Sequence, residues 1–170
     1  TRIAAAKAFS TLGKSKGLSK LAAANIEDKE SGEAVLTAIR DVYAKQPLDY
    51  VLKGAKSKKN AILKRCAVAT LGAMVATKEG RRYRKTIAET LQSLAGSKDA
   101  EIRAAAARSF ELMPGKDVRA ELMKLTADSD LTVKRAVGRA LRAYPGADSL
   151  KQLLQYAEAD DAALLAKLDA

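Results

Sequence analysis

The sequence predicts an all-α protein built from repeated helical hairpins. Its 170 residues include 35 alanines but only ten glycines and three prolines, and this composition favours closely packed helices. An apolar pattern with helical spacing also recurs along the chain, and short segments that contain Gly or Pro separate the predicted helices. The length suits one domain or one stretch of a repeat protein.

One recurring block of residues predicts one helix of each hairpin. Each copy has a short polar residue, an apolar anchor three positions later, and small or apolar residues three, four, seven and eight positions after the anchor. These offsets share one helical face, so we expect that face to be buried. The anchor positions, in chain order, are Ser31 in a weaker copy, then Leu63, Ile102 and Val133. The polar residues before them, which we expect to cap the helix N-termini, are Asp28, Asn60, Asp99 and Asp130.

Second helices with their own apolar stripes lie between the blocks and complete about five hairpins. We place these hairpins near residues 17–45, 47–77, 80–113, 116–144 and 147–169. A truncated copy of the block at Ala4, Ala5, Ala8 and Phe9 predicts a first helix without a hairpin partner. We interpret residues 1–170 as a single repeat domain that is part of a longer protein, because both ends would otherwise expose apolar surface. We therefore expect further repeats or another subunit to cover the ends.

The spacing of the anchors predicts an insertion in the middle of the chain. The step from Leu63 to Ile102 is 39 residues, against 32 and 31 residues for the other steps. The extra residues fall around positions 77–85. Insertions in repeat proteins usually map to one surface, so this segment should be the most individual part of the chain.

Two copies of the block resemble HEAT repeats. They begin Asp99-x-x-Ile102-Arg103 and Asp130-x-x-Val133-Lys134. They resemble the short bacterial variety that also occurs in phycobilin lyase subunits. This resemblance implies a right-handed α-solenoid of stacked helix pairs with a curved inner surface used for binding. It also implies that Arg103 and Lys134, next to the anchors, form a structural ladder with loop aspartates of adjoining repeats.

The titratable side chains argue against catalysis. The chain has no His and a single Cys, which excludes a Ser-His-Asp triad, a Cys-His dyad and a zinc site of the Cys/His type. We interpret Cys66 as a buried, inert thiol because it lies among apolar positions. The tight acidic groups at 128–130 and 160–161 fit helix caps better than a metal or acid/base pair. We therefore predict no enzyme, no catalytic residue, no metal and no cofactor.

Positive charge is concentrated in one fifth of the chain. The net charge is +11, and residues 53–85 hold eleven basic residues and one acidic residue, a net charge of +10. One cluster, in a loop between two helices, consists of Lys56, Lys58 and Lys59. A second cluster, which we expect to begin a helix beside the insertion, consists of Arg81, Arg82, Arg84 and Lys85. Cations in a first helical turn oppose the helix dipole, and such a local cost is often found at a binding site.

A second basic feature lies on the outward side of the block helices. Positions two, six and nine after an anchor face away from the core, and in the last well-formed copy they are Arg135, Arg139 and Arg142. Earlier copies contribute Arg65 and Arg108 at these positions. Stacked side by side, these arginines would line the concave surface. The alternative interpretation is an ordinary helix surface with local pairing, such as Arg108 with Glu111.

These observations favour a non-enzymatic scaffold or adaptor that binds an acidic protein partner through the basic loop and the concave helical surface. One alternative is nucleic-acid binding, in which the same basic surface contacts the phosphate backbone. A second alternative is a lyase- or chaperone-type HEAT subunit. No apolar run is long enough to span a membrane. The sequence leaves the compartment open and favours the cytoplasm.

Overall fold

The computed structural model describes residues 2–12, 15–23, 29–58, 60–144, 146 and 151. Every regular element in these ranges is a helix, as the sequence predicts. The chain divides into two compact units, Thr1–Leu91 and Gln92–Ala170, and each is described by itself. Among the described helices, none is both long enough and apolar enough to cross a lipid bilayer.

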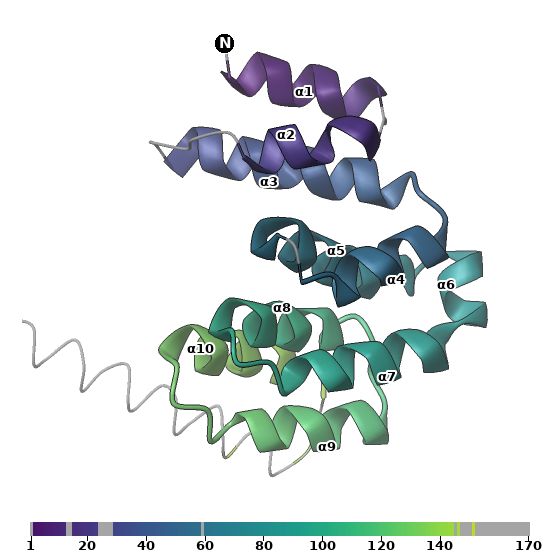
Figure 1. Cartoon of the computed structure of the whole chain (residues 1–170). Helices are drawn as coiled ribbons and strands as arrows, with labels where there is room; N and C mark the ends of the chain where they lie inside the picture. Colours follow the sequence, from purple (N-terminus) through teal and green to yellow (C-terminus); the bar gives the residue numbers. More distant parts are fainter. Residues whose placement is uncertain are drawn as a thin grey trace, which may run out of the picture. The chain divides into compact units, whose positions relative to one another are not determined.

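The first unit is a stack of helices joined by short loops (Figure 1). Its helices are α1 (Arg2–Leu12), α2 (Leu18–Ala22), α3 (Lys29–Ala44), α4 (Leu48–Lys56), α5 (Ala61–Met74) and α6 (Lys78–Arg82). A short 3-10 helix, η1 (Ser15–Gly17), precedes α2. Helix α3 packs against both α1 and α5, and α4 packs against α5. Helix α7 (Arg84–Ala95) begins in this unit and ends in the second.

The second unit continues with one closely packed pair of helices and a third helix beside them (Figure 1). The helices are α8 (Ala100–Phe110), α9 (Lys116–Leu125) and α10 (Leu131–Leu141). Helix α10 packs along α8, and α9 contacts both. Helices α8 and α10 carry the two clearest copies of the recurring block, so the block predicts which helices pack together.

The buried side chains follow the predicted offsets. The bulky residue eight positions after each anchor is fully or almost fully buried, at Ile39, Leu71, Phe110 and Leu141. The residues at the third and fourth offsets are buried in the last three blocks, for example Ala105 and Ala106, and these small side chains let the neighbouring helix approach closely. The apolar face of each block helix is therefore the core of the fold, and its opposite face is left for solvent or for a partner.

The predicted N-terminal caps are present at three of the four blocks. The Asn60 side chain accepts a hydrogen bond from Leu63 N (2.9 Å), and the Asp99 carboxylate accepts one from Glu101 N (2.9 Å). The Asp130 carboxylate accepts from the backbone N–H of both Thr132 (2.8 Å) and Val133 (3.3 Å). Each cap satisfies backbone donors that the helix cannot pair itself. The fourth predicted cap, Asp28, lies outside the described residues.

The insertion forms the short helix α6, and this corrects one prediction. Arg81 and Arg82 do not begin a helix; they end α6, whereas Arg84 and Lys85 begin α7 after a break at Tyr83. The dipole cost that the sequence suggests for four cations therefore applies only to Arg84 and Lys85, because a last helical turn favours cations.

Gly80 allows α6 to fold back against the end of α5. A Cβ atom at this position would lie 1.9 Å from the Met74 carbonyl oxygen, so no larger residue fits without a shift of the backbone. Thr77 secures the same turn, because its hydroxyl donates to Met74 O (2.7 Å) and accepts from Gly80 N (3.0 Å). The insertion is therefore an ordered corner that follows α5.

Some predictions fall outside the described residues. They concern Lys59, the acidic pair at 160–161 and nearly all of the hairpin predicted at 147–169.

Candidate binding surface

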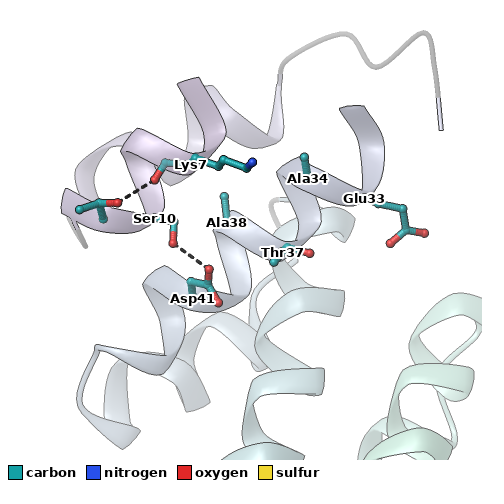
Figure 2. A pocket seen from close by; sticks show the side chains of 8 residues that line it. Lys7, Ser10, Glu33, Ala34, Thr37, Ala38 and Asp41 are labelled. Atoms are coloured by element: carbon teal, nitrogen blue, oxygen red, sulfur yellow. Dashed lines mark hydrogen bonds between the residues drawn. The ribbon is translucent and has the colours of Figure 1, made fainter. Parts of the chain in front are cut away.

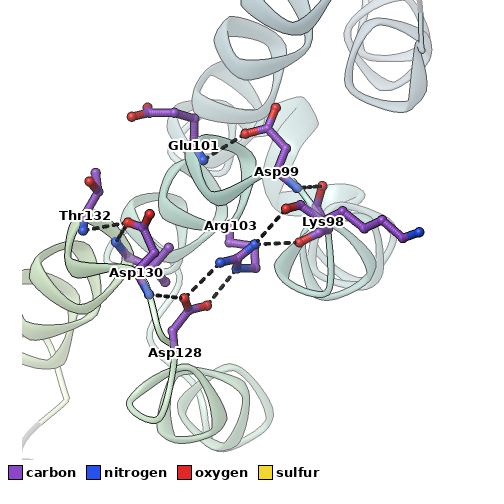
Figure 3. Close-up of polar contacts among 9 residues, drawn as sticks. Lys98, Asp99, Glu101, Arg103, Asp128, Asp130 and Thr132 are labelled. Atoms are coloured by element: carbon purple, nitrogen blue, oxygen red, sulfur yellow. Dashed lines mark hydrogen bonds and ion pairs between the residues drawn. The ribbon is translucent and has the colours of Figure 1, made fainter.

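A charged ladder joins the loops that lead into α8 and α10 (Figure 3). The Arg103 guanidinium binds the Asp128 carboxylate through two hydrogen bonds, from Nε to Oδ2 (2.7 Å) and from Nη2 to Oδ1 (2.9 Å). Its Nη1 donates to the carbonyl oxygens of Ser97 (2.9 Å) and Lys98 (3.2 Å). One side chain thus connects the loop before α8 to the loop before α10. The structural role predicted for Arg103 is confirmed.

Protonation equilibria at the ladder follow from these hydrogen bonds. The Arg103 guanidinium, together with the backbone N–H of Asp130, holds the pKa of Asp128 below its ordinary range. The same hydrogen bond raises the pKa of Arg103. Lys134, the second residue for which a ladder is predicted, adds positive charge beside Asp128 and lowers the Asp128 pKa further. The loop that follows α10, where a partner for Lys134 is expected, lies largely outside the described residues.

The other end of the α8 and α10 pair is fastened by Tyr144. This buried side chain follows α10, and its hydroxyl donates to the backbone carbonyls of Phe110 (2.6 Å) and Met113 (3.0 Å). These carbonyls belong to the end of α8 and the turn after it, where Phe110 O also accepts from Met113 N (3.0 Å). The two helices are therefore tied together at both ends.

Between these ties, α8 and α10 form a surface hollow of about 240 Å³. It is lined by Arg108, Thr132, Arg135, Ala136 and Arg139. The three arginines are exposed, whereas Ala136 is buried. The structure therefore brings together three of the arginines that the offset rule selects. Among the described residues, no ion pair joins Arg108 to Glu111, which was the alternative interpretation.

Helices α1 and α3 of the first unit form a second hollow, of about 370 Å³ (Figure 2). Its charged and polar lining includes Lys7, Ser10, Glu33, Thr37 and Asp41. Ser10 Oγ donates to the Asp41 carboxylate (2.7 Å), and Figure 2 shows this hydrogen bond across the two helices. The two hollows have the same origin, because each lies between two successive block helices.

The residues of the two hollows occupy equivalent positions in the block. Lys7 and Arg108 both stand six positions after the anchor position of their helix. In the next helix of each pair, Glu33 corresponds to Arg135 and Thr37 corresponds to Arg139, two and six positions after the anchor. The sequence interpretation missed the first hollow, although the same offset rule applied to the first two block helices would have found it.

The comparisons with known proteins agree with this geometry. Residues 87–168 match the family model for HEAT repeats. Over these residues the chain is similar to HEAT-repeat proteins. A chain in the solved structure of the complex of CpcE and CpcF of phycocyanin lyase from Nostoc sp. PCC7120 superposes with a TM-score of 0.57 and 18% sequence identity, over 80% of this chain and 86% of that chain. No curated protein matches the sequence. The predicted family and the predicted fold class of HEAT-like helical hairpins are confirmed.

The basic residues of the insertion differ in what they contact. Arg81 is exposed, but its Nη1 donates to the carbonyl oxygen of Ala76 (2.6 Å), so this side chain helps to close the end of α5. Arg84 is half-buried. Arg82 and Lys85 are exposed, and the Arg82 guanidinium lies 5.6 Å from the centre of the Tyr83 ring. Arg82 and Lys85 therefore remain the candidates in this cluster for contact with a partner.

The other predicted basic residues do not line the arginine hollow. Lys56 and Lys58 are exposed at the end of α4, and Arg65 is half-buried on α5, all in the first unit. Arg142 is exposed at the C-terminal end of α10 but lies outside the lining of the hollow. Arg142 is consequently a control position, because it is a neighbouring exposed arginine on the same helix.

Cys66 is buried, as predicted. Burial raises the pKa of its thiol to about 11, although Arg40 and Arg65 act in the opposite direction. A thiol with this pKa is protonated at neutral pH and is a poor nucleophile. Among the described residues, no three His, Cys, Asp or Glu side chains gather in a way that could hold a metal ion.

Proposed function

We propose that this HEAT-repeat chain is a binding subunit that holds an acidic surface of another protein against the hollow between α8 and α10. The observation that carries the proposal is the convergence of Arg108, Arg135 and Arg139 on a hollow whose lining contains no acidic residue. Arginine forks bind carboxylates through paired, charge-assisted hydrogen bonds, so this lining suits an acidic partner.

The first unit supports this assignment by contrast. Its equivalent hollow contains Glu33 and Asp41 beside Lys7, so the fold itself does not require a basic lining. Arg108 and Arg139 add positive charge to the lining of the second hollow, and an anionic partner would be attracted to that charge. The structural neighbour is a chain of a complex of two proteins, which supports a protein as the partner.

Two alternatives remain as second candidates, each favoured by one observation. The net charge of +10 over residues 53–85 favours contact with nucleic-acid phosphates. The phycocyanin lyase complex favours a lyase-type subunit, but at 18% identity this likeness concerns the fold alone. We favour the protein partner because the arginines gather in one compact hollow, whereas backbone contact with nucleic acid needs cations along an extended surface.

The proposal can be tested with labelled poly-L-glutamate and a labelled DNA duplex, each titrated across a salt series. We expect poly-L-glutamate to bind at low salt, and we expect Arg108→Gln combined with Arg139→Gln to weaken binding by about tenfold or more. The matched control, Arg142→Gln, should change the Kd by less than about twofold.

Two results would overturn the proposal. One is the absence of any binding of poly-L-glutamate at low salt. The other is binding of DNA alone that depends on Arg82 and Lys85 and not on the hollow, which would establish the nucleic-acid alternative.

A further inference from the structure

We infer that the hollow between α8 and α10 is a subsite for a single phosphoryl group carried by a side chain of the partner protein. This inference rests on the proposed function and narrows it, because it replaces a generally acidic surface by one doubly charged group. The inference is based on the residues that line the hollow, on its difference from the equivalent hollow of the first unit, and on the hydrogen bonds at both ends of the helix pair.

The charge of the lining matches a dianion better than a single carboxylate. Arg108, Arg135 and Arg139 bring three positive charges to about 240 Å³, and no acidic residue lines the hollow. A phosphorylated serine or threonine carries about −1.5 to −2 charges at pH 7 and three strong acceptor oxygens, whereas a carboxylate carries one charge. The Arg108 and Arg139 guanidinium groups can therefore each find acceptors on one phosphoryl group, and Arg135 adds positive charge beside them.

The arrangement of the donors also suits a compact group. Arg108 comes from α8, while Arg135 and Arg139 stand one helical turn apart on α10, so the arginines reach the hollow from both helices. Ala136 between them is small, which leaves space beneath the guanidinium groups. The Thr132 hydroxyl offers a further donor in the same lining.

The hollow is held in shape before a ligand arrives. The Arg103–Asp128 ladder ties the loops at one end of the helix pair, and the Tyr144 hydroxyl ties the other end. Because the two helices are fixed, binding has to order only the side chains of the lining and not the backbone that carries them. The hollow therefore discriminates between ligands by charge and shape, which a set of exposed lysines on a loop does poorly.

The test uses three peptide libraries that differ only at the central position, which is phosphoserine, serine or glutamate, with acidic residues omitted elsewhere. Binding to the full chain is followed by fluorescence anisotropy at physiological salt, and unlabelled inorganic phosphate serves as the competitor. We expect the phosphoserine library to bind about tenfold or more tightly than the glutamate library, with the serine library weaker still.

Substitutions of arginine by lysine separate the effect of paired hydrogen bonds from the effect of charge. Arg108→Lys with Arg139→Lys keeps the charge but removes the bidentate forks, and we expect most of the preference for phosphoserine to be lost. Arg142→Gln should leave the preference unchanged. Thermal unfolding should show that the lysine variant remains folded, and inorganic phosphate should raise the Tm of the parent chain more than that of this variant.

The possible outcomes distinguish the inference from the proposed function. Equal binding of the glutamate and phosphoserine libraries would overturn the phosphoryl subsite and leave the acidic partner in place. Full preference in the lysine variant would also overturn it, because charge alone would then explain the binding. Failure of all the libraries to bind, while poly-L-glutamate binds, would overturn the inference but not the proposed function.

Discussion

The hollow between α1 and α3 and the hollow between α8 and α10 are built by the same repeat, yet they differ in charge. At equivalent positions, Lys7, Glu33 and Thr37 line the first, and Arg108, Arg135 and Arg139 line the second. In the first, the hydrogen bond from Ser10 to Asp41 uses part of the polar lining within the protein itself. The repeat therefore determines where a hollow forms, while the residues on the outward side of the block helices determine its charge.

The largest expected effect comes from exchanging charge between the two hollows. Arg139→Glu places a negative charge in the lining of the second hollow, and we expect its affinity for poly-L-glutamate to fall by about a hundredfold. Glu33→Arg together with Thr37→Arg gives the first hollow the cations of the second, and this variant should bind poly-L-glutamate more tightly than the parent chain. Anisotropy titrations measure both effects.

Two results of this charge exchange would contradict the comparison. If the variant with arginines in the first hollow shows no gain, position in the block does not define a functional equivalence between the hollows. Unchanged affinity in Arg139→Glu would remove the second hollow from the binding surface.

A large effect on stability is expected at the ladder, which has no counterpart among the described contacts between α1 and α3. Arg103→Ala removes a two-point ion pair whose side chains are only 16% and 8% exposed, and leaves the Asp128 carboxylate without its guanidinium. We expect the free energy of unfolding to fall by about 2–3 kcal/mol. Hydrogen exchange should quicken in α8 and α10 and remain unchanged in α1 and α3, if the ladder acts within the second unit.

The pH dependence of stability provides a second test of the ladder. The pKa of Asp128 in the folded chain is lower than its ordinary value of 3.8, so below about pH 4 the unfolded state binds a proton before the folded state does. The stabilisation from Asp128 is therefore complete above this pH and is lost as the pH falls through the folded pKa. Acid unfolding of Asp128→Asn should lose this component, and a profile identical to that of the parent chain would contradict the assignment.

Much of this structure follows from the sequence, because apolar periodicity and capping residues act over short distances. The offsets correctly placed Phe110 and Leu141 in the core, and the residue types placed caps at Asp99 and Asp130. The helix start at Arg81 was predicted wrongly, because α6 already begins at Lys78, after its cap Thr77, and ends before Tyr83. Apolar periodicity does not reveal a helix of five residues, and the close approach of Gly80 to the Met74 carbonyl becomes visible only in the structure.

The candidate site could be predicted only in part. The offset rule selected Arg108, Arg135 and Arg139, but it also selected Arg142, which does not line the hollow. The choice among them depends on where the partner helix begins and ends, and periodicity within one helix does not contain that information. Likewise, the count of positive charge could not separate Arg81, whose guanidinium donates to the Ala76 carbonyl, from Arg82, whose guanidinium lies over the Tyr83 ring.

A moderate effect is expected at the opposite end of the helix pair from the ladder. Tyr144→Phe keeps the buried ring but removes the donor to the carbonyls of Phe110 and Met113. The Phe110 carbonyl keeps its hydrogen bond from Met113 N (3.0 Å), so we expect a loss of about 1–1.5 kcal/mol in the free energy of unfolding, the net value of a typical hydrogen bond. Urea denaturation measures this change in the free energy of unfolding. An unchanged midpoint of the urea transition would mean that water replaces the hydroxyl.

The smallest expected effect lies in the first hollow, where Ser10→Ala removes the hydrogen bond to Asp41 (2.7 Å). The bond is only partly buried, and water can reach the carboxylate, so we expect a loss of about 0.5–1 kcal/mol, well below that of Arg103→Ala. Lys45 Nζ donates to the backbone carbonyl of Ser10, and this contact survives the substitution. Urea denaturation, with Thr11→Ala on the same helix as the matched control, measures the difference. A loss as large as that at Arg103 would mean that the first hollow is as firmly tied as the second, and the contrast between the two would then reside in charge alone.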